Sequence, residues 1–346
     1  MKLIHVGVGN WGLDWEKHAL PHVPEVERVA VVEPAEPILK RAREVLSLSD
    51  AVSFRSLDEA LAATDAELVL ITTPMETHVP LAIQAMEAGR HVLVEKPFAP
   101  SVAEARQAVA AAERTGRTLM VSQNYRFYPA PRTAARLTAG GELGTAGNVS
   151  VEFRRWANDA AAGRAHRHYD YRHPLLFDMA IHHYDLMRLV LGQDAVEVWA
   201  RDTSPSWSRF TEEAAATLVV TFANGQTVTY SGSWVSPGEP TNWAGEWRME
   251  FEDGELSWTS RGGYEAGTSG DQVSFRRLDG TVTEVPMETL PRLGRSMGLR
   301  QLAEHITAGT EPESAGRNNL GTVAIMEAAA RSMETGRAEP VEQISD

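Results

Sequence analysis

The chain has 346 residues, of which 43% are hydrophobic and 23% charged, the balance of a globular protein with ample material for a core. At roughly 150 residues per domain, this length predicts two domains. The formal net charge of -14 argues against a nucleic-acid partner, since phosphate binding needs a basic surface. No apolar run reaches the roughly 18 residues of a membrane span, and the absence of cysteine excludes disulfides and thiolate metal sites. The first strand is expected from Lys2, which leaves no room for a signal peptide, so we expect a cytoplasmic protein.

The first third of the chain alternates strand and helix patterns, as a doubly wound parallel sheet requires. Strands are expected at residues 3–7, 26–32, 52–54, 67–72, 92–94 and 118–122. Helices are expected at residues 13–20, 57–63, 73–88 and 102–115. We place the end of this first domain just after the last of these strands, so that it covers residues 1–123.

A glycine pattern follows the first strand directly. Residues 7–12, Gly-Val-Gly-Asn-Trp-Gly, match the Gly-x-Gly-x-x-Gly fingerprint of dinucleotide-binding Rossmann domains. Gly7 allows the tight turn, Gly9 the approach of the backbone to pyrophosphate, and Gly12 the close packing of the following helix. The N-terminus of that helix offers N–H groups and partial positive charge to the phosphates.

Glu33 ends the second strand, 21 residues after Gly12. This is near the spacing of roughly 20 residues expected for the acid that binds the adenosine ribose hydroxyls. A carboxylate there repels a 2′-phosphate and favours NAD, while Arg41 and Arg43 on the next helix leave NADP open. The alternative is that Glu33 is a solvated acid at a strand end.

The second half of the chain changes character, with strand-like stretches separated by turn signals. Strands are expected at residues 148–156, 195–201, 214–222, 226–235, 246–251, 255–259 and 272–278. Helices are expected at residues 131–139, 175–191, 296–308 and 318–335. Asn224-Gly225, between two of the strands, is a strong hairpin signal. We therefore expect an α+β domain over residues 124–346 with a large, mainly antiparallel open sheet, whose C-terminal helices are free to pack back on the first domain.

Val92-Leu93-Val94 is a continuous apolar run, typical of a strand buried on both faces of a parallel sheet. Pro97 stops this strand because it has no N–H for the ladder. Glu95 and Lys96 then lie at the carboxyl end of a central strand, where open α/β sheets bind their ligands. Lys96 is a compact cation with three donors, suited to orienting a substrate hydroxyl and carrying its proton. The structural alternative is a lysine that caps a buried salt bridge.

Asp178 and His182 are four residues apart on the helix expected at 175–191, so their side chains share one face. An imidazole with an unperturbed pKa of about 6.5 suits removal of a proton from an alcohol. Asp178 can raise the basicity of that imidazole or bind a neighbouring hydroxyl, whereas His183 points about 100° away. The alternative is a buried histidine satisfied by its own acid. A metal site is not expected, because these residues and Asp185 do not share one face.

Several stretches in this sequence stand in the order and at the spacings of one enzyme family. They are residues 7–12, Thr73-Pro74-Met75-Glu76-Thr77-His78, Gly89-Arg90-His91-Val92, Glu95-Lys96-Pro97 and Asn124-Tyr125-Arg126-Phe127. The chain resembles the glucose–fructose oxidoreductase / inositol dehydrogenase / rhizopine-catabolism (Gfo/Idh/MocA) family of NAD(P)-dependent oxidoreductases over nearly its full length. The resemblance implies a cis Lys96–Pro97 peptide and assigns the family's catalytic Asp-x-x-x-His pair to Asp178 and His182. The chain departs from the family at residues 171–174, where a glycine-rich approach to the helix is common.

The resemblance also implies the residues of both binding sites. The cofactor-binding residues are Gly7, Gly9, Asn10, Trp11, Gly12, Glu33, Thr73, Pro74, His78, Glu95 and Lys96. The substrate-binding residues are Lys96, Tyr125, Arg126, Trp156, Asp178 and His182. Trp156 would give a sugar ring an apolar platform, although a core or interface position also explains a tryptophan.

We therefore expect an NAD-dependent dehydrogenase that moves a hydride between nicotinamide and a secondary hydroxyl of a monosaccharide, polyol or sugar acid. Lys96 and His182 would take part in proton transfer, with Asp178 orienting the imidazole. The alternative is a non-catalytic NAD(P)-binding sensor of the same fold, which would need neither Lys96 nor His182. The arginine- and histidine-rich segment 154–173 would contact an anionic substrate group, or be solvated or face another subunit. The open face of the sheet needs a cover, and the resemblance implies that copies of the chain pair through this face as a homodimer or homotetramer.

Overall fold

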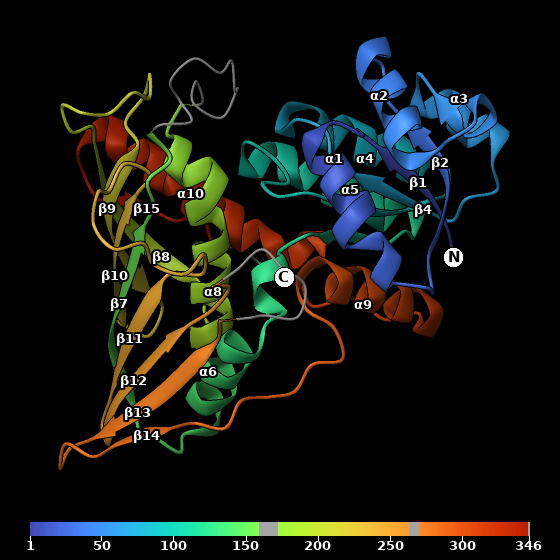
Figure 1. The fold of residues 1–346 in the computed structure, drawn as a ribbon. Helices are drawn as coiled ribbons and strands as arrows, with labels where there is room; N and C mark the ends of the chain where they lie inside the picture. The colour runs from blue at the N-terminus through green and yellow to red at the C-terminus, as the bar shows by residue number, and fades with distance from the viewer. Residues whose placement is uncertain (159–171, 263–269, 345–346) are drawn as a thin grey trace. The chain divides into compact units, whose positions relative to one another are not determined.

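The computed structural model describes the protein at residues 1–158, 172–262 and 270–344 (Figure 1). Every helix and strand discussed below lies within these ranges. No helix of the described ranges is both long enough and apolar enough to span a membrane.

The chain divides into two compact units. Unit 1 holds residues 1–124 and 294–323, and unit 2 holds residues 125–293 and 324–346. Residues 294–323, from the C-terminal region that we expect to be free to pack back on the first domain, join unit 1. The glycine motif therefore belongs to a unit made from the N-terminal third of the sequence and a segment close to its C-terminal end.

Unit 1 is built on a six-stranded sheet in which each strand runs parallel to its neighbours. The strands are β1 (Lys2–Val6), β2 (Glu27–Val32), β3 (Ser53–Phe54), β4 (Leu68–Ile71), β5 (His91–Val94) and β6 (Leu119–Val121). Their order across the sheet is β3-β2-β1-β4-β5-β6, which reverses between β1 and β4. All four residues of β4 are completely buried, as both faces of a central parallel strand should be. The predicted doubly wound sheet is confirmed.

Helices connect the strands of unit 1, and the C-terminal region adds two more. They are α1 (Asn10–His18), α2 (Glu36–Leu46), α3 (Leu57–Ala63), α4 (His78–Glu87), α5 (Val102–Thr115), α9 (Gly294–Ala308) and the first part of α10 (Gly316–Thr335). The first helix begins at Asn10 rather than at residue 13, because the Leu13 amide donates to the Gly9 carbonyl at 2.8 Å. It therefore begins inside the glycine motif.

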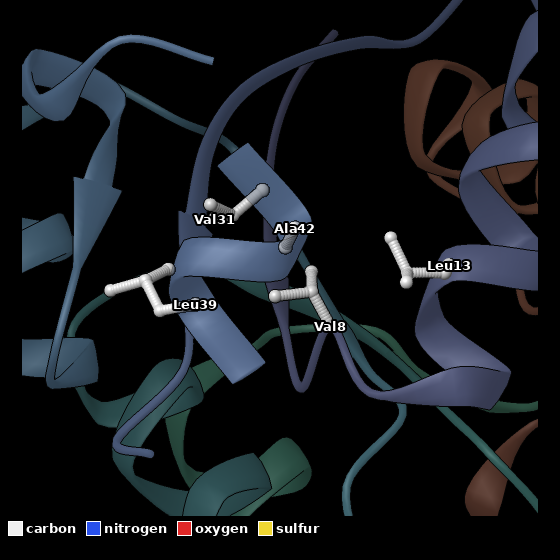
Figure 2. Close-up of a cluster of buried hydrophobic side chains, with 5 residues drawn as sticks. All are labelled: Val8, Leu13, Val31, Leu39 and Ala42. Atoms are coloured by element: carbon white, nitrogen blue, oxygen red, sulfur yellow. The ribbon is translucent and has the colours of Figure 1, made fainter. Parts of the chain in front are cut away.

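A cluster of buried aliphatic side chains holds the glycine motif against its neighbours (Figure 2). Its members come from the loop after β1, from α1, from β2 and from α2: they are Val8, Leu13, Val31, Leu39 and Ala42. Leu46 and Leu48 pack against it from the end of α2. Because Val8 lies between two motif glycines, the core of unit 1 reaches directly into the loop.

Residues just before α10 cover the open edge of the sheet in unit 1. The Val121 amide donates to the Ser314 carbonyl at 2.9 Å, and the Ser314 hydroxyl donates back to the Val121 carbonyl at 2.9 Å. Met120 and Ala315 form an antiparallel bridge beside them. The edge strand β6 would otherwise present unpaired N–H and C=O groups, so a distant segment completes this sheet.

Unit 2 contains a nine-stranded sheet of order β14-β13-β12-β11-β7-β10-β9-β8-β15. The strands are β7 (Ala146–Arg154), β8 (Ala195–Thr203), β9 (Ala215–Phe222), β10 (Thr227–Ser233), β11 (Glu246–Phe251), β12 (Gly254–Thr259), β13 (Gln272–Arg277), β14 (Val282–Glu284) and β15 (Glu339–Pro340). In this described sheet β7 and β10 pair in parallel, and the remaining pairs are antiparallel. The predicted mainly antiparallel sheet is confirmed. Sequence reasoning missed β14 and β15, which are too short to show a periodic pattern.

The turn between β9 and β10 is the hairpin expected from Asn224-Gly225. The Phe222 amide donates to the Gln226 carbonyl at 2.8 Å, which closes the hairpin. Gly225 has a φ of +86°, a value that side chains disfavour. The Asn224 side chain accepts from the Gln226 amide at 3.0 Å and so supports the turn from within.

The helices of unit 2 include α6 (Pro129–Gly140) and α8 (Ile181–Leu191), with the second part of α10. α8 is preceded by a π-helical turn at Leu176–Ala180, where the sequence predicts the first turn of one α-helix over residues 175–191. Such turns are rare and often occur at functional sites. The expectation of a single α-helix is therefore wrong at Asp178, which lies in the wider turn.

His183 of α8 is part of the core of unit 2. Its Nδ1 lies 3.0 Å from the Tyr230 hydroxyl and its Nε2 lies 3.1 Å from the Trp243 carbonyl. Because a carbonyl oxygen only accepts, Nε2 carries the ring proton and Nδ1 accepts from Tyr230. Burial lowers the pKa of His183 to about 4. The residue is thus a neutral structural histidine.

This buried histidine predicts an acid-dependent loss of stability. An unfolded chain binds a proton at histidine near pH 6.5, whereas folded His183 binds one only at about pH 4. Below pH 6.5 the unfolded state therefore binds more protons, so lowering the pH from about 6.5 to about 4 reduces the free energy of unfolding by roughly 3 kcal/mol through this residue. His183→Gln removes the titration and should lose less stability over this range in urea unfolding.

The exposed His22 provides the matched control. His22→Gln should lose as much stability on acidification as the unchanged protein. Equal losses in the His183→Gln and unchanged proteins would contradict the assignment of His183 as a buried neutral group.

Candidate active site

The glycine motif forms a tight cradle at the start of α1. Gly7 has a φ of +92°, and a Cβ there would lie 2.7 Å from Thr73 Cγ2. A Cβ at Gly12 would lie 2.0 Å from the Gly7 carbonyl oxygen, whereas one at Gly9 would meet no atom within 4 Å. Gly7 and Gly12 therefore permit close packing, while Gly9 leaves its surroundings open. This arrangement suits the backbone approach that a pyrophosphate requires.

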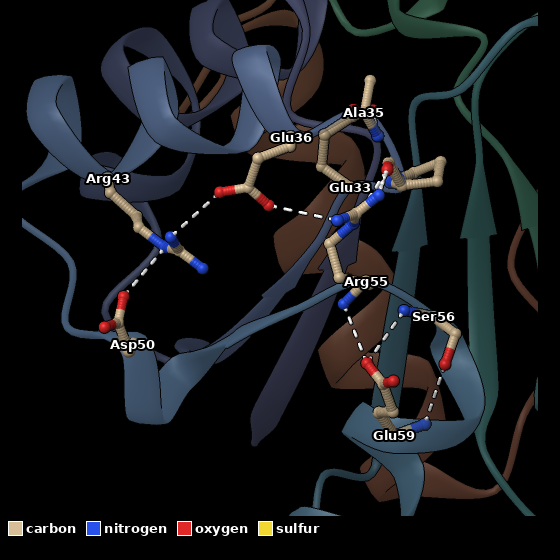
Figure 3. A network of polar contacts seen from close by, with 9 residues as sticks. Glu33, Ala35, Glu36, Arg43, Asp50, Arg55, Ser56 and Glu59 are labelled. Carbon is tan, nitrogen blue, oxygen red and sulfur yellow. Dashed lines mark hydrogen bonds and ion pairs between the residues drawn. The ribbon is translucent and has the colours of Figure 1, made fainter.

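Glu33 lies directly after β2, within the polar network of Figure 3. Its carboxylate accepts from the Ala35 amide at 3.1 Å, and its own amide donates to the Phe54 carbonyl at 3.0 Å. The residue is 8% exposed. The carboxylate is thus held in place at the carboxyl end of β2, where the ribose-binding acid of a dinucleotide fold belongs.

The two arginines considered for NADP have different surroundings. Arg43 pairs with Glu36 at 3.5 Å and with Asp50 at 3.3 Å (Figure 3). The Arg41 guanidinium donates to the Asn10 side chain at 2.9 Å, beside the glycine motif. Arg43 therefore lies between two carboxylates, and Arg41 contacts a residue predicted to bind the cofactor.

Glu95 joins the Glu-Lys-Pro turn to α1. Its carboxylate accepts from the Trp15 indole N–H at 2.7 Å and from the Lys96 amide at 3.2 Å. Glu95 is 4% exposed, and Lys96 is partly buried after the end of β5, where the sequence predicts it. The Lys96–Pro97 peptide is cis, which confirms that prediction. The carboxylate of Glu95 is thus bound by the protein itself, and its contact with cofactor stays a prediction.

His78 contacts both the Glu-Lys-Pro turn and the segment after β4. Its Nδ1 lies 2.8 Å from the Pro97 carbonyl and its Nε2 lies 2.8 Å from the Thr73 carbonyl. Burial lowers the pKa of His78, against the two carbonyls and the Glu95 charge, which favour the protonated ring. Three residues predicted for the cofactor site, Thr73, His78 and Glu95, therefore share one local network in unit 1.

Arg295 of α9 holds the outer side of α1. It pairs with Asp14 at 2.5 Å, and its guanidinium carbon lies 4.5 Å from the Trp11 ring centre and 5.2 Å from that of Trp15. Trp11 is 42% exposed. A cation over an indole is attracted to the ring, so α9 helps to fix the first turns of α1.

His182 of unit 2 is stacked on an aromatic ring. The rings of His182 and Tyr125 are parallel within 4°, and their centres lie 3.8 Å apart. The guanidinium carbon of Arg261 lies 4.1 Å from the centre of the same Tyr125 ring. Arg261 has a φ of +63°, uncommon for a residue with a side chain. The stack fixes the plane of an imidazole that is 4% exposed and four residues after Asp178.

Arg126 and Trp156, both predicted to bind substrate, have contrasting positions in unit 2. The Arg126 guanidinium donates to both carboxylate oxygens of Asp185, at 2.9 and 2.6 Å, and both side chains are at most 5% exposed. Trp156 is 44% exposed and forms an isolated bridge with Val235. Arg126 thus fastens the segment after β6 to α8. The substrate contacts of both residues stay predictions.

The arginine- and histidine-rich segment 154–173 lies largely outside the described residues, which omit residues 159–171. At its start the guanidinium carbon of Arg155 lies 4.2 Å from the Trp243 ring centre. At its end His173 lies 2.9 Å from an oxygen of Asp202. These two contacts belong to unit 2 and leave the anion-binding hypothesis a prediction.

Sequence reasoning missed several residues that support these sites. They are His5, Trp15, Glu16, Arg261 and Arg295. Two of them could have been found from the sequence, because a polar residue at a buried position needs a partner. His5 interrupts an apolar strand, and Glu16 follows Leu13 by three residues on the buried face of α1. The arginines gave no local signal, because their aromatic partners are distant in sequence.

Family models match two consecutive stretches of the chain. A model described as "Oxidoreductase family, NAD-binding Rossmann fold" matches residues 1–123. A model described as "GFO/IDH/MocA C-terminal domain" matches residues 131–257. The NAD-binding model precedes the C-terminal model along the sequence, as the resemblance implies.

Individual relatives extend this match. D-apiose dehydrogenase of Paraburkholderia graminis is 28% identical over 92% of this chain and 84% of its own length. scyllo-Inositol 2-dehydrogenase (NAD(+)) of Bacillus subtilis is 27% identical over 67% of each chain. Both names describe dehydrogenases of sugars or related polyols.

Solved structures share the whole architecture. Aldose-aldose oxidoreductase from Caulobacter crescentus superposes with a TM-score of 0.83 at 22% identity, covering 98% of this chain and 99% of that one. The WlbA dehydrogenase from Bordetella pertussis, solved with NADH and UDP-GlcNAcA, gives 0.81 at 20% identity, covering 99% and 98%. The two family models, which together match most of the sequence, place the chain in the Gfo/Idh/MocA family of NAD-binding oxidoreductases.

Proposed function

We propose that this protein is an NAD-dependent dehydrogenase acting on a secondary hydroxyl of a monosaccharide, polyol or sugar acid. The observation that carries the proposal is the setting of His182, a buried imidazole held flat against Tyr125 and four residues after Asp178. Such an imidazole suits general base catalysis, because its orientation is fixed before substrate binds. The relatives named for D-apiose and scyllo-inositol support a polyhydroxylated substrate.

Each proposed catalytic group has a defined part in the reaction. When bound, nicotinamide supplies the hydride acceptor. His182 takes the hydroxyl proton as the carbon–hydrogen bond breaks, and the Lys96 ammonium donates a hydrogen bond to the same oxygen. Asp178 orients the imidazole or binds a neighbouring hydroxyl. Lys96 and His182 belong to different units, and their joint action is part of the proposal.

The preference for NAD rests on Glu33. The Glu33 carboxylate is held at the end of β2 by the Ala35 amide. In that position it would accept hydrogen bonds from the ribose hydroxyls of NAD and would repel the 2′-phosphate of NADP. Arg43 is engaged by two acids, which weakens the case for its use in binding NADP.

Replacing Glu33 by serine tests the cofactor preference. The unchanged protein should bind NADH more tightly than NADPH. Glu33→Ser should lower the ratio of the NADPH dissociation constant to the NADH dissociation constant by about tenfold or more. Titration of tryptophan fluorescence gives both constants. Glu44→Ser removes one exposed acid from α2 and should leave the ratio unchanged. Tighter binding of NADPH by the unchanged protein would show that Glu33 is wrongly assigned.

Replacing the proposed proton-transfer residues separates an enzyme from a sensor. Lys96→Met and His182→Ala should each lower the turnover of an identified sugar or polyol by roughly 10²–10⁴-fold. NADH binding should survive, because the glycine cradle and Glu33 supply that affinity. The kcat of the unchanged enzyme for alcohol oxidation should rise with pH as the base loses its proton, and His182→Ala should lose this rise.

Two exposed residues of unit 1 provide the controls for this experiment. Lys17→Met and His22→Ala repeat the two chemical changes on the surface and should leave turnover unchanged. A His182→Ala protein that works at the original rate would remove the histidine from the mechanism. Tight NADH binding without turnover of any sugar or polyol would favour the sensor.

We also propose that copies of the chain associate through the sheet of unit 2. α6 and α8 lie along one face of this sheet (Figure 1), with Tyr230 directed to His183 of α8. Because side chains alternate along a strand, Thr229 and Ser231 point to the other face. These two residues are exposed and uncharged.

Light scattering tests this association. The unchanged protein should be a dimer or tetramer at micromolar concentration, and Thr229→Arg should shift it to monomer because like charges would meet across the face. Thr283→Arg makes the same change on the edge strand β14 and should not alter the mass. A stable monomer of the unchanged protein would count against the proposal.

A further inference from the structure

A buried chain of hydrogen bonds crosses unit 1 beneath the glycine motif. His5 of β1 is completely buried; its Nδ1 lies 2.8 Å from Glu16 Oε1 and its Nε2 lies 2.9 Å from Thr72 Oγ1. The Thr72 hydroxyl lies 2.5 Å from the Gly7 carbonyl oxygen. At the other end, Arg28 of β2 donates to Glu16 Oε2 at 3.2 Å. These hydrogen bonds thus connect a partly buried arginine to the first glycine of the motif.

The partners of His5 decide how many protons its ring carries. The Thr72 hydroxyl faces two carbonyl oxygens, that of Gly7 at 2.5 Å and that of Val6 at 3.3 Å. A carbonyl oxygen only accepts, so Thr72 donates its single hydroxyl proton to them, principally to the nearer Gly7 carbonyl. Its oxygen must then accept from Nε2–H of His5. Burial works to raise the pKa of Glu16, but the hydrogen bond and charge of His5, with those of Arg28, outweigh it and lower the pKa. Glu16 pairs with the Arg28 guanidinium at 3.2 Å, as a carboxylate does. A carboxylate oxygen only accepts, so Glu16 accepts from Nδ1–H, and both ring nitrogens of His5 donate.

We propose that His5, as a doubly protonated ring, is a positioning residue for the cofactor loop, acting through Thr72 on the Gly7 carbonyl. The proposal rests on the proposed function, in that the loop binds a nicotinamide dinucleotide. The charged groups facing His5 in the described residues are Glu16 of α1 and, through it, Arg28 of β2.

The geometry of the peptide unit explains how this contact acts on the loop. In a trans peptide the C=O and the following N–H point in opposite directions. Holding the Gly7 oxygen toward Thr72 therefore also fixes the direction of the Val8 N–H. A Gly-rich loop binds phosphate through such amide groups. Glycine can adopt many backbone conformations, so a hydrogen bond to the Gly7 carbonyl restrains this part of the loop.

Substitutions at Thr72 test the proposal through cofactor binding. Thr72→Val keeps the shape but removes the hydroxyl, and should raise the NADH dissociation constant about tenfold, the effect of one lost buried hydrogen bond. Thr72→Ser keeps the hydroxyl and should bind NADH within about threefold of the unchanged protein. Thr64→Val is the matched control, since the Thr64 hydroxyl also donates to a carbonyl, that of Ala60 at 2.8 Å, but away from the loop. It should not alter NADH binding.

The protonation of His5 is measured directly by nitrogen NMR of the histidine rings. The signals that vanish in His5→Gln are those of His5, and both nitrogens should show the shifts of an imidazolium at neutral pH.

The outcomes separate this inference from the proposed function. If the unchanged protein binds neither NADH nor NADPH, the proposed function fails and the inference fails with it. If it binds NADH, a neutral His5 ring at neutral pH or an unaltered dissociation constant in Thr72→Val overturns the inference alone. If Thr72→Val does not fold, the nitrogen NMR measurement on the unchanged protein still decides.

Discussion

The buried hydrogen bond between the Trp15 indole and the Glu95 carboxylate joins the two motifs on which unit 1 depends. α1 begins inside the glycine cradle, and Glu95 immediately precedes Lys96, so this single contact relates the nucleotide loop to the lysine. A hydrogen bond to a buried charge is among the stronger ones, and loss of the donor would leave the carboxylate unsatisfied. Asp14 and Glu16, on either side of Trp15, are held by other elements. The helix is therefore fixed along its length rather than only at its packed face.

Much of this arrangement followed from local patterns. The alternation of strands and helices predicted the parallel sheet, and Asn224-Gly225 predicted a hairpin, because each depends on neighbouring residues. Contacts between distant residues could not be predicted in this way. Glu95 and Trp15 are 80 positions apart, and Arg126 and Asp185 are 59 apart. The sequence around one member of such a pair therefore does not indicate which distant residue it contacts. The π-helical turn at Leu176–Ala180 was missed because an α-helical spacing of apolar residues continues through it.

His182 and His183 show how position in a helix separates two neighbouring side chains. His183 points into the core of unit 2, where Tyr230 and the Trp243 carbonyl occupy both ring nitrogens and burial keeps the ring neutral. His182 is instead stacked on Tyr125, with Arg261 over the same ring. Stacking restrains the plane of an imidazole through its face and does not itself use the ring nitrogens. The sequence pair His-His therefore combines a structural residue with one whose setting suits chemistry.

The pairing of Ser314 and Ala315 with β6 has a consequence for the order in which the protein folds. A ribosome delivers residues from the N-terminus, so the six strands of unit 1 emerge long before the segment that covers their edge. Until residues 294–323 follow, β6 has one unpaired side and α1 lacks Arg295, whose contact with Asp14 spans 281 positions. During synthesis the nucleotide-binding unit thus passes through an incomplete state with an exposed strand edge, the kind of surface that chaperones protect.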